Sequence, residues 1–429
     1  MFKDTHHIHF IGIGGSGISS LVHLAVSKGM KVTGSDSVHS PITNNLEKEG
    51  IKIFFGHDAK HITDLTEMVI FTEAIDPNTN PEYLEAKKRE LPMMSYFEAL
   101  SDFSKQKKTI VVIGSHGKTT TTGMLGVMMK EAGLDPLVIL GSTVKQFNNH
   151  NIHAGLGEYF VVEGCEYRRS FLNLQPFGVV LLNCEADHLD YYKSEADYVN
   201  AFIELMTMIP EDGFLIYNTE DKNSLEIAKH AKCKIVGLSQ AEADKLPFEL
   251  KVPGDFNRMN ASMVREVAKI LNIEDEGKAG LESFNGTARR LEIVGEFDGV
   301  TLINDYAHHP TEIKATLKAI KEHYKGRRII CSFQPHQYSR TYELLEGFKT
   351  SFNDADVVIV PNIYAARDTE ETKSKINGKS FAEALIHPDG RWGEDFDTTF
   401  NMLKEEAKEG DIIIIMGAGD QVKIVDRFI

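Results

Sequence analysis

The sequence predicts an α/β protein whose mainly parallel sheets are built from repeated strand–helix units. Three observations support this fold class. Short β-branched and apolar runs alternate with helical segments along the chain. Two of these runs end in glycine-rich turns that open helices, at Gly12–Gly17 and Gly114–Thr121. Polar clusters follow several later strands, where the carboxyl edge of a parallel sheet gathers ligand-binding residues.

The length and composition indicate a protein of several domains. At 429 residues the chain is too long for one hydrophobic core, so two or three domains are expected. A net charge of −16 without a polybasic block argues against nucleic acid or an anionic membrane as partner. Four widely spaced cysteines indicate no disulfide framework. The N-terminus lacks a signal-peptide pattern and no apolar run is long enough to cross a membrane, so we expect a cytoplasmic protein.

Three domains are expected, each opening with a strand and a loop that carries functional residues. Residues 1–106 form a Rossmann-like domain, 107–291 a central P-loop ATPase-like domain with a mainly parallel sheet, and 292–429 a second Rossmann-like domain. The polar piece Ser101–Lys108 is interpreted as a linker. The first helix is expected at Ile18–Lys28, and strands are expected at Ile8–Ile13, Lys31–Gly34, Thr109–Ile113, Tyr159–Val162, Val179–Leu182, Val300–Ile303, Arg328–Ser332, Val357–Val360 and Asp411–Met416.

The first glycine turn has the pattern of a nucleotide site. It follows an apolar strand and opens a helix, and Asp36 ends the next strand. This spacing is typical of the dinucleotide-binding motif, in which the acidic residue contacts a ribose hydroxyl. A tight turn without a ligand is the alternative. The candidate residues of the turn are Gly12, Gly14, Gly15, Ser16 and Gly17.

The second glycine turn is a phosphate-binding loop of unusual length. Val112 stands where a standard Walker A motif has its first glycine. Backbone N–H groups and a helix N-terminus would face the anion, Lys118 would reach the terminal phosphates, and Thr119 would hold Mg²⁺. The candidate residues are Gly114, Ser115, His116, Gly117, Lys118, Thr119 and Thr120.

Two acidic strand ends are expected beside this loop. Glu163 ends an apolar strand, and Asp187 and His188 follow the next one. In a parallel sheet these side chains reach the edge that carries the phosphate loop. Glu163 would ligate Mg²⁺ directly or through water, and His188 would contact a metal or the substrate.

Further candidates lie closer to the C-terminus. Asn257 and Asn260 share a helix face and would bind adenine or phosphates, or else cap the helix. Arg290 would reach a phosphate. Asp305 ends a strand that runs into two histidines and a proline that starts a helix. Arg340 is the best candidate in that region for a bidentate grip on a carboxylate.

Taken together, these segments resemble the Mur ligase family of peptidoglycan synthesis. The family has a Gly-x-Gly-Gly-x-Gly turn and an ATP loop Gly-Thr-His-Gly-Lys-Thr-Thr, in which Ser115 replaces the threonine here. The resemblance spans essentially the whole chain. Further matching signatures are Asn183–Asp190, Asp305–Glu312, Gln334–Thr341 and Met416–Asp420.

The resemblance implies an ADP-forming ligase with ATP and Mg²⁺. Such an enzyme joins L-alanine to the lactyl carboxylate of UDP-N-acetylmuramate through an acyl phosphate, as a cytoplasmic monomer or homodimer. The Gly12–Gly17 turn would hold the UDP-sugar in place of NAD. The other implied roles are phosphate binding for Lys118, one Mg²⁺ for Thr119 and Glu163, a second for His188, ATP contacts for Asn257 and Asp305, and amino-acid binding for His336 and Arg340.

The chain departs from the family pattern at three places. The family often has Glu-Ala-Asp-Glu-Ser-Asp where Glu163-Gly-Cys-Glu-Tyr-Arg stands here, arginine where Gln337 stands, and a longer segment between Cys233 and Pro253. A related ligase that attaches a recycled tripeptide to UDP-N-acetylmuramate is one alternative. An NAD-dependent oxidoreductase is another; it would explain the first glycine turn but leave Lys118 without a role.

Overall fold

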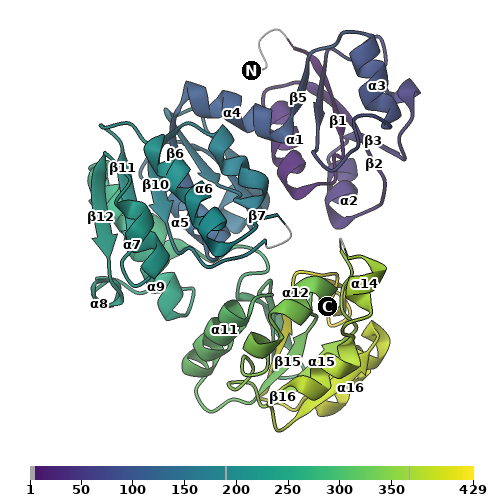
Figure 1. Ribbon diagram of the computed structural model, residues 1–429, viewed down its shortest axis with the longest axis vertical. Helices are drawn as coiled ribbons and strands as arrows, with labels where there is room; N and C mark the ends of the chain where they lie inside the picture. Colours follow the sequence, from purple (N-terminus) through teal and green to yellow (C-terminus); the bar gives the residue numbers. More distant parts are fainter. Residues whose placement is uncertain (1–4, 189–190, 367) are drawn as a thin grey trace. The chain divides into compact units, whose positions relative to one another are not determined.

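The structure of the chain is a computed structural model that describes residues 5–188, 191–366 and 368–429. The described residues form three sheets of five, seven and six strands. Figure 1 shows helices around each sheet, with the chain running from purple through teal to yellow. The predicted α/β class with three domains is confirmed.

The first sheet is entirely parallel, in the order β3-β2-β1-β4-β5. The strand order reverses beside β1, so a crevice forms at the carboxyl ends of β1 and β4, where doubly wound sheets bind ligands. Its elements are β1 (His7–Ile11), α1 (Ser16–Ser27), β2 (Lys31–Asp36), α2 (Pro41–Lys48), β3 (Lys52–Phe55), β4 (Met68–Phe71), α3 (Pro81–Lys88), β5 (Met93–Ser95) and α4 (Tyr96–Gln106).

The second sheet has the order β12-β11-β10-β6-β9-β7-β8, and only its edge strand β8 runs antiparallel to the others. β6 lies between β9 and β10, so the loop after β6 meets the ends of both neighbours. Its strands are β6 (Lys108–Ile113), β7 (Leu137–Val144), β8 (His150–Ala154), β9 (Tyr159–Glu163), β10 (Pro176–Leu181), β11 (Phe214–Asn218) and β12 (Lys234–Leu238). Its helices are α5 (Lys118–Glu131), α6 (Glu195–Thr207), α7 (Lys222–Ala228), α8 (Gln240–Ala243), α9 (Asp255–Ile270) and α10 (Glu274–Ser283).

The third sheet has the order β13-β14-β18-β15-β16-β17, and only the edge strand β13 runs antiparallel. Its strands are β13 (Glu292–Phe297), β14 (Val300–Asp305), β15 (Ile329–Phe333), β16 (Val357–Pro361), β17 (Gly390–Glu394) and β18 (Ile412–Met416). Its helices are α11 (Pro310–His323), α12 (Tyr338–Glu343), α13 (Leu345–Phe348), α14 (Glu370–Lys373), α15 (Gly378–Ala384), α16 (Phe396–Glu406) and α17 (Val422–Val425).

The chain divides into two compact units. One holds the first two sheets and comprises the residues up to Glu249 together with Met259–Phe284. The other comprises Leu250–Arg258 and Asn285–Ile429. Among the described residues we find no helix with the length and apolarity of a membrane span.

The interpretation of Ser101–Lys108 as a linker is wrong. α4 continues to Gln106, and β6 begins at Lys108. Phe103 and Ser104 are buried in the helix, and Ser95 caps its first turn by accepting a hydrogen bond from Glu98 N. Lys105 and Gln106 lie on the exposed side of an amphipathic helix, a pattern that the charge of the segment obscured.

Candidate active site

Two glycines shape the loop between β6 and α5. Gly114 has φ of 144° and Gly117 has φ of 86°, values that residues with a Cβ rarely adopt. A Cβ on Gly114 would also lie 3.0 Å from the carbonyl oxygen of Asn183. Gly117 is the N-cap residue of α5. Because it has no side chain, the first N–H groups of the helix have no side-chain cap. The helix therefore presents open N–H donors to an anion.

The segment after β10 holds this loop in place. The Asn183 side chain accepts a hydrogen bond from His116 N at 2.9 Å and donates one to His116 O at 3.1 Å. The Ser115 hydroxyl donates to the carbonyl of Glu185 and accepts from the Glu185 N–H. It also lies 3.0 Å from the Tyr198 hydroxyl. The loop is thus fixed by side chains before any ligand binds.

Lys118 is largely buried at the base of the loop, with its side chain 14% exposed. Its ammonium group donates to the carbonyls of Gly114 and Ser115 and lies 3.0 Å from Glu166 Oε1. Burial alone would lower the pKa of Lys118, but the carboxylates of Glu166 and Glu163 outweigh this effect and raise it. Lys118 is therefore a permanent positive charge at the phosphate loop.

Thr119 and Glu163 meet beside Lys118. The Thr119 hydroxyl lies 3.0 and 2.9 Å from the two carboxylate oxygens of Glu163. The N–H of Gly141 on β7 donates to the same carboxylate at 2.8 Å and orients it. A hydroxyl and a carboxylate are the oxygen donors that Mg²⁺ prefers, so these residues fit the predicted metal.

His188 approaches the loop from the other side. Its Nε2 atom lies 3.4 Å from Glu166 Oε1, and its backbone φ is 56°. Glu166 Oε2 is buried and has no hydrogen-bond partner, so the carboxylate keeps an acceptor for a cation or a ligand. Burial would raise the pKa of Glu166, but Lys118 and His188 outweigh it and lower the pKa. Leu189 and Asp190, which end the predicted motif, lie outside the described residues.

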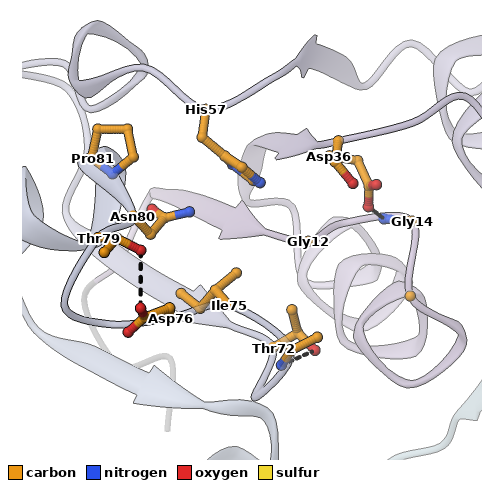
Figure 2. Close-up of a pocket in the computed structure, with 13 residues that line it drawn as sticks. Gly12, Gly14, Asp36, His57, Thr72, Ile75, Asp76, Thr79, Asn80 and Pro81 are labelled. Atoms are coloured by element: carbon orange, nitrogen blue, oxygen red, sulfur yellow. Dashed lines mark hydrogen bonds between the residues drawn. The ribbon is translucent and has the colours of Figure 1, made fainter. Parts of the chain in front are cut away.

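The first glycine turn forms a second site in the same unit. Gly12 has φ of 79°, and a Cβ on Gly14 would lie 2.9 Å from Asp36 Oδ2. Gly14 N donates to that oxygen at 2.8 Å, as Figure 2 shows. The turn and Asp36 line a cavity of about 580 Å³ together with His57 and Thr72. The spacing of the turn and Asp36 therefore corresponds to a real hollow at the carboxyl edge of the sheet.

A buried glutamate fixes His57 at this cavity. Glu82 is fully buried and lies 2.8 Å from His57 Nδ1 and 2.5 Å from His61 Nδ1. The Ser35 hydroxyl donates to it, and His9 lies 3.5 Å away. Burial would raise the pKa of Glu82, but the hydrogen bonds from His9, Ser35 and His57 outweigh it and lower the pKa to about 2. Glu82 is an ionised anchor for this group of histidines.

The second unit carries the remaining candidates at strand and helix ends. Asp305 ends β14, and its carboxylate accepts from Leu291 N at 2.7 Å and Ala307 N at 2.8 Å. Burial raises the pKa of Asp305 to about 6, although these two N–H donors oppose the shift. Arg290 lies over the Tyr306 ring at 4.8 Å. Asp305 lies at the edge of the sheet, and its hydrogen bond from Leu291 N fixes the backbone directly after Arg290.

Asn257 is buried near the start of α9. Its Nδ2 atom donates to Pro253 O at 2.7 Å, while its Oδ1 atom is buried without a hydrogen-bond partner. A simple helix-capping role would use the oxygen as an acceptor for a backbone N–H group. The unused oxygen instead fits a ligand that carries a donor, such as the amino group of adenine.

His336 and Arg340 lie together after β15. Arg340 Nη1 is 3.5 Å from His336 Nδ1, and the His336 ring stacks on Tyr364 at 5.3 Å. Gln337, between them in the sequence, has φ of 68° and is the N-cap that precedes α12. This loop presents an imidazole and a guanidinium side by side, which suits a carboxylate.

The structure gathers most predicted residues of each unit and adds several that the sequence analysis missed. The loop residues Gly114–Thr120, Glu163 and His188 form one site, and Gly12–Gly17 with Asp36 forms another. Glu166 contacts both Lys118 and His188, although the sequence analysis assigns it no role. Its signal was an acidic residue three positions after Glu163. Asn183 opens the matching signature Asn183–Asp190 but is likewise assigned no role from the sequence, whereas Tyr198, His57 and Glu82 lie outside the motifs.

Three family descriptions match the chain in succession. They are "Mur ligase family, catalytic domain" over residues 7–108, "Mur ligase middle domain" over 112–246 and "Mur ligase, glutamate ligase domain" over 289–419. These ranges correspond to the first, second and third sheets.

Full-length relatives are similar to the whole chain. UDP-N-acetylmuramate–L-alanine ligase of Clostridium novyi is 38% identical and that of Clostridium tetani 40% identical; each match covers 100% of this chain and 98% of the relative. Among solved structures, UDP-N-acetylmuramate–alanine ligase MurC of Thermotoga maritima matches with a TM-score of 0.82 at 27% identity, over 98% of both chains. A murein peptide ligase of Psychrobacter arcticus shares the fold, with a TM-score of 0.70 at 24% identity, over 99% of this chain and 98% of that one.

Proposed function

Because the chain belongs to the Mur ligase family, we propose that it joins L-alanine to the lactyl carboxylate of UDP-N-acetylmuramate at the expense of ATP. The full-length relatives at 38% and 40% identity carry this activity in their names. The observation that supports the proposal most strongly is the buried Lys118 beside the Thr119–Glu163 pair. Such a site binds and polarises a nucleoside triphosphate.

The reaction needs ATP because a free carboxylate does not acylate an amine. A carboxylate oxygen attacks the γ-phosphorus, the bond to the β-γ bridging oxygen breaks, and ADP leaves. The amine of L-alanine then attacks the acyl carbon and loses a proton, and phosphate leaves with the electron pair of the C–O bond. The products are the amide, ADP and phosphate.

In the proposed mechanism, Lys118 stabilises the transfer of the γ-phosphoryl group to the carboxylate. Its buried charge lies at the base of the loop that cradles the phosphates, where charge moves onto the β-γ bridging oxygen. The open N–H groups at the start of α5 hold the same phosphates. Mg²⁺, held by Thr119 and Glu163 with His188 at a second position, would neutralise the triphosphate when bound. Glu166 contacts both Lys118 and His188 and holds them beside the loop.

The substrates are assigned to separate sites. The Gly12–Gly17 turn takes the diphosphate of the sugar nucleotide, and Asp36 takes a ribose hydroxyl. Asn257, Arg290 and Asp305 contact ATP, and His336 with Arg340 receives the carboxylate of the amino acid. Both ATP and UDP-linked precursors are cytoplasmic compounds, so the reaction is placed in the cytoplasm.

The alternative acceptor is a peptide. A ligase that attaches a recycled tripeptide to UDP-N-acetylmuramate would use the same loop, Lys118 and Glu163, and would differ only at the His336–Arg340 side. An NAD-dependent oxidoreductase would use the first glycine turn but leave the phosphate loop without a task. The choice between acceptors therefore rests on an assay and not on the phosphate site.

A phosphate-release assay tests the proposal. The purified chain is incubated with ATP, Mg²⁺ and UDP-N-acetylmuramate, and L-alanine, L-serine, glycine and the tripeptide L-alanyl-γ-D-glutamyl-meso-diaminopimelate are added one at a time. We expect phosphate release with L-alanine at a kcat/KM at least about tenfold above that with the tripeptide. Preferential release with the tripeptide would support the alternative. Binding of NADH without any amino-acid-dependent phosphate release would contradict the ligase assignment.

A further inference from the structure

We infer that His23, Glu49 and His150 form a binding site for a divalent transition-metal ion of the zinc class, where the first sheet's helices meet the second sheet. His23 lies on α1, Glu49 follows α2, and His150 begins β8. The site is separate from the phosphate loop and uses none of the residues assigned to the ligase reaction. The inference does not depend on the proposed function.

The three side chains already have the spacing of metal ligands. Their donor atoms all lie within 4.8 Å of one another. The carboxylate oxygens of Glu49 lie 3.2 Å from His23 Nε2 and 3.6 Å from His150 Nε2. Ligand atoms of a tetrahedral zinc ion, at bond lengths of about 2.0–2.1 Å, are roughly 3.4 Å apart. A metal ion would therefore require only small side-chain movements.

His23 faces Glu49 from a position shielded from solvent. Both of its ring nitrogens are shielded, and its Nδ1 atom has no hydrogen-bond partner. Its Nε2 atom lies 3.2 Å from the Glu49 carboxylate, as one ligand of a metal ion lies from the next. Its ring lies 4.4 Å from the His150 ring, at an interplanar angle of 37°. The two imidazoles thus face the Glu49 carboxylate together, and a metal ion between them would bind the Nε2 atoms of both rings and a carboxylate oxygen.

The polypeptide around the site is well anchored. Asn151, next to His150, donates its Nδ2 hydrogens to Ser16 O at 2.5 Å and to Ser19 Oγ at 3.2 Å. Ser19 lies one turn before His23 on α1, so β8 is fixed to the same face of the helix that carries His23. The ligands therefore come from rigid elements, which favours a defined coordination geometry.

The donor set selects the class of ion. Two imidazole nitrogens and one carboxylate suit Zn²⁺ and its neighbours in the transition series, whereas Mg²⁺ and Ca²⁺ prefer oxygen ligands alone. Three protein ligands leave a fourth position for water. Because the ligands come from elements of both sheets in the unit, the bound ion would fasten α1 and α2 to β8. We assign it a stabilising role.

Zinc titration of the full chain tests the site. The protein is stripped with a chelator, saturated with Mg²⁺, and titrated with Zn²⁺ against a chromophoric competitor. We expect one tight Zn²⁺ per chain, and at least about tenfold weaker binding in His23→Ala, Glu49→Gln and His150→Gln. His153→Gln is the matched control, because His153 lies on the same strand but pairs with Asp135 at 2.9 Å. It should bind Zn²⁺ as the unaltered chain does.

The thermal midpoint provides a second readout. Zn²⁺ should raise the midpoint of the unaltered chain and of His153→Gln equally, and should raise that of Glu49→Gln clearly less at the same free Zn²⁺ concentration. Glu49 is partly exposed, so its replacement leaves the fold intact even where His23→Ala does not fold. Equal zinc affinity and stoichiometry in Glu49→Gln, His150→Gln and the unaltered chain would overturn the inference, since any ion would then bind elsewhere. Absence of tight Zn²⁺ binding to the unaltered chain would overturn it as well.

Discussion

Gly12–Gly17 and Gly114–Thr121 both connect the end of a parallel strand to the start of a helix, yet their surroundings differ in charge. At the first turn, Gly14 N donates to the carboxylate of Asp36, and no lysine belongs to the motif. At the second, Lys118 is buried among loop carbonyls and the carboxylate of Glu166. The same backbone plan therefore suits binding of a nucleotide at one turn and polarisation of a triphosphate at the other.

The largest effect is expected from removing the charge that distinguishes the second turn. Lys118→Ala should lower kcat for L-alanine-dependent ADP release by about 10³-fold, because the charge that develops during phosphoryl transfer loses its partner. Lys130→Ala, in the last turn of the same helix, is the control and should stay near normal. Near-normal ADP release by Lys118→Ala would show that the charge of Lys118 is not needed at the second turn. It would thereby contradict the proposal that only this turn polarises a triphosphate.

Glu166→Gln should have the next largest effect. The substitution keeps the shape of the side chain but removes the charge that holds both Lys118 and His188. We expect kcat to fall by about 100-fold while the KM for UDP-N-acetylmuramate stays unchanged, since that substrate is assigned to the other turn. Glu204→Gln, which pairs with Arg169 on the surface, is a suitable control. A variant within twofold of normal activity would mean that Glu166 is only structural.

Glu82→Gln tests the buried contacts that hold His57 beside the first turn, and its effect is measured as a change in the free energy of unfolding. The pKa of Glu82 is lowered from 4.5 to about 2, so its stabilising contribution is fully present above about pH 4.5 and is lost as the pH falls towards 2. We expect the variant to lose on the order of 2 kcal/mol of unfolding free energy at pH 7. Urea unfolding at several pH values measures this loss. A destabilisation that does not shrink between pH 5 and pH 2 would contradict an ionised Glu82.

Gly14→Ala should give the smallest effect and one confined to the first turn. The new Cβ would approach Thr43 Cγ2 to 2.8 Å and Asp36 Oδ2 to 2.9 Å. We expect the KM for UDP-N-acetylmuramate to rise about tenfold with an unchanged kcat. Gly15→Ala is the matched comparison, because its Cβ would approach nothing closer than 3.4 Å. A KM of Gly14→Ala equal to that of the unaltered chain would argue that the turn does not contact the sugar nucleotide.

The sequence predicted the parts of the fold that depend on local patterns. The strands expected at Thr109–Ile113, Val357–Val360 and Asp411–Met416 correspond to β6, β16 and β18 with shifts of about one residue. Their continuous apolar runs are typical of strands buried on both faces. The family identification, based on several motifs together, is also confirmed.

Features that depend on tertiary contacts were not predicted. β7 and β8 form an antiparallel pair whose connection contains Asn148 and Asn149 with positive φ, and their alternation is too irregular to signal strands. Glu82 belongs to no recognisable sequence motif, and it comes close to His57 only when the chain is folded. Likewise, the spacing of His23, Glu49 and His150 along the chain gives no metal-binding pattern. The roles of individual site residues stay predictions until variants are measured.

The most direct test of the central claim follows an oxygen atom. UDP-N-acetylmuramate labelled with ¹⁸O in its lactyl carboxylate is turned over with ATP, Mg²⁺ and L-alanine, and the released phosphate is analysed by mass spectrometry. Attack of the carboxylate on the γ-phosphorus predicts one ¹⁸O atom in each phosphate derived from labelled substrate, dependent on Lys118. Amide formation with unlabelled phosphate would contradict an acyl-phosphate intermediate and the role assigned to this loop.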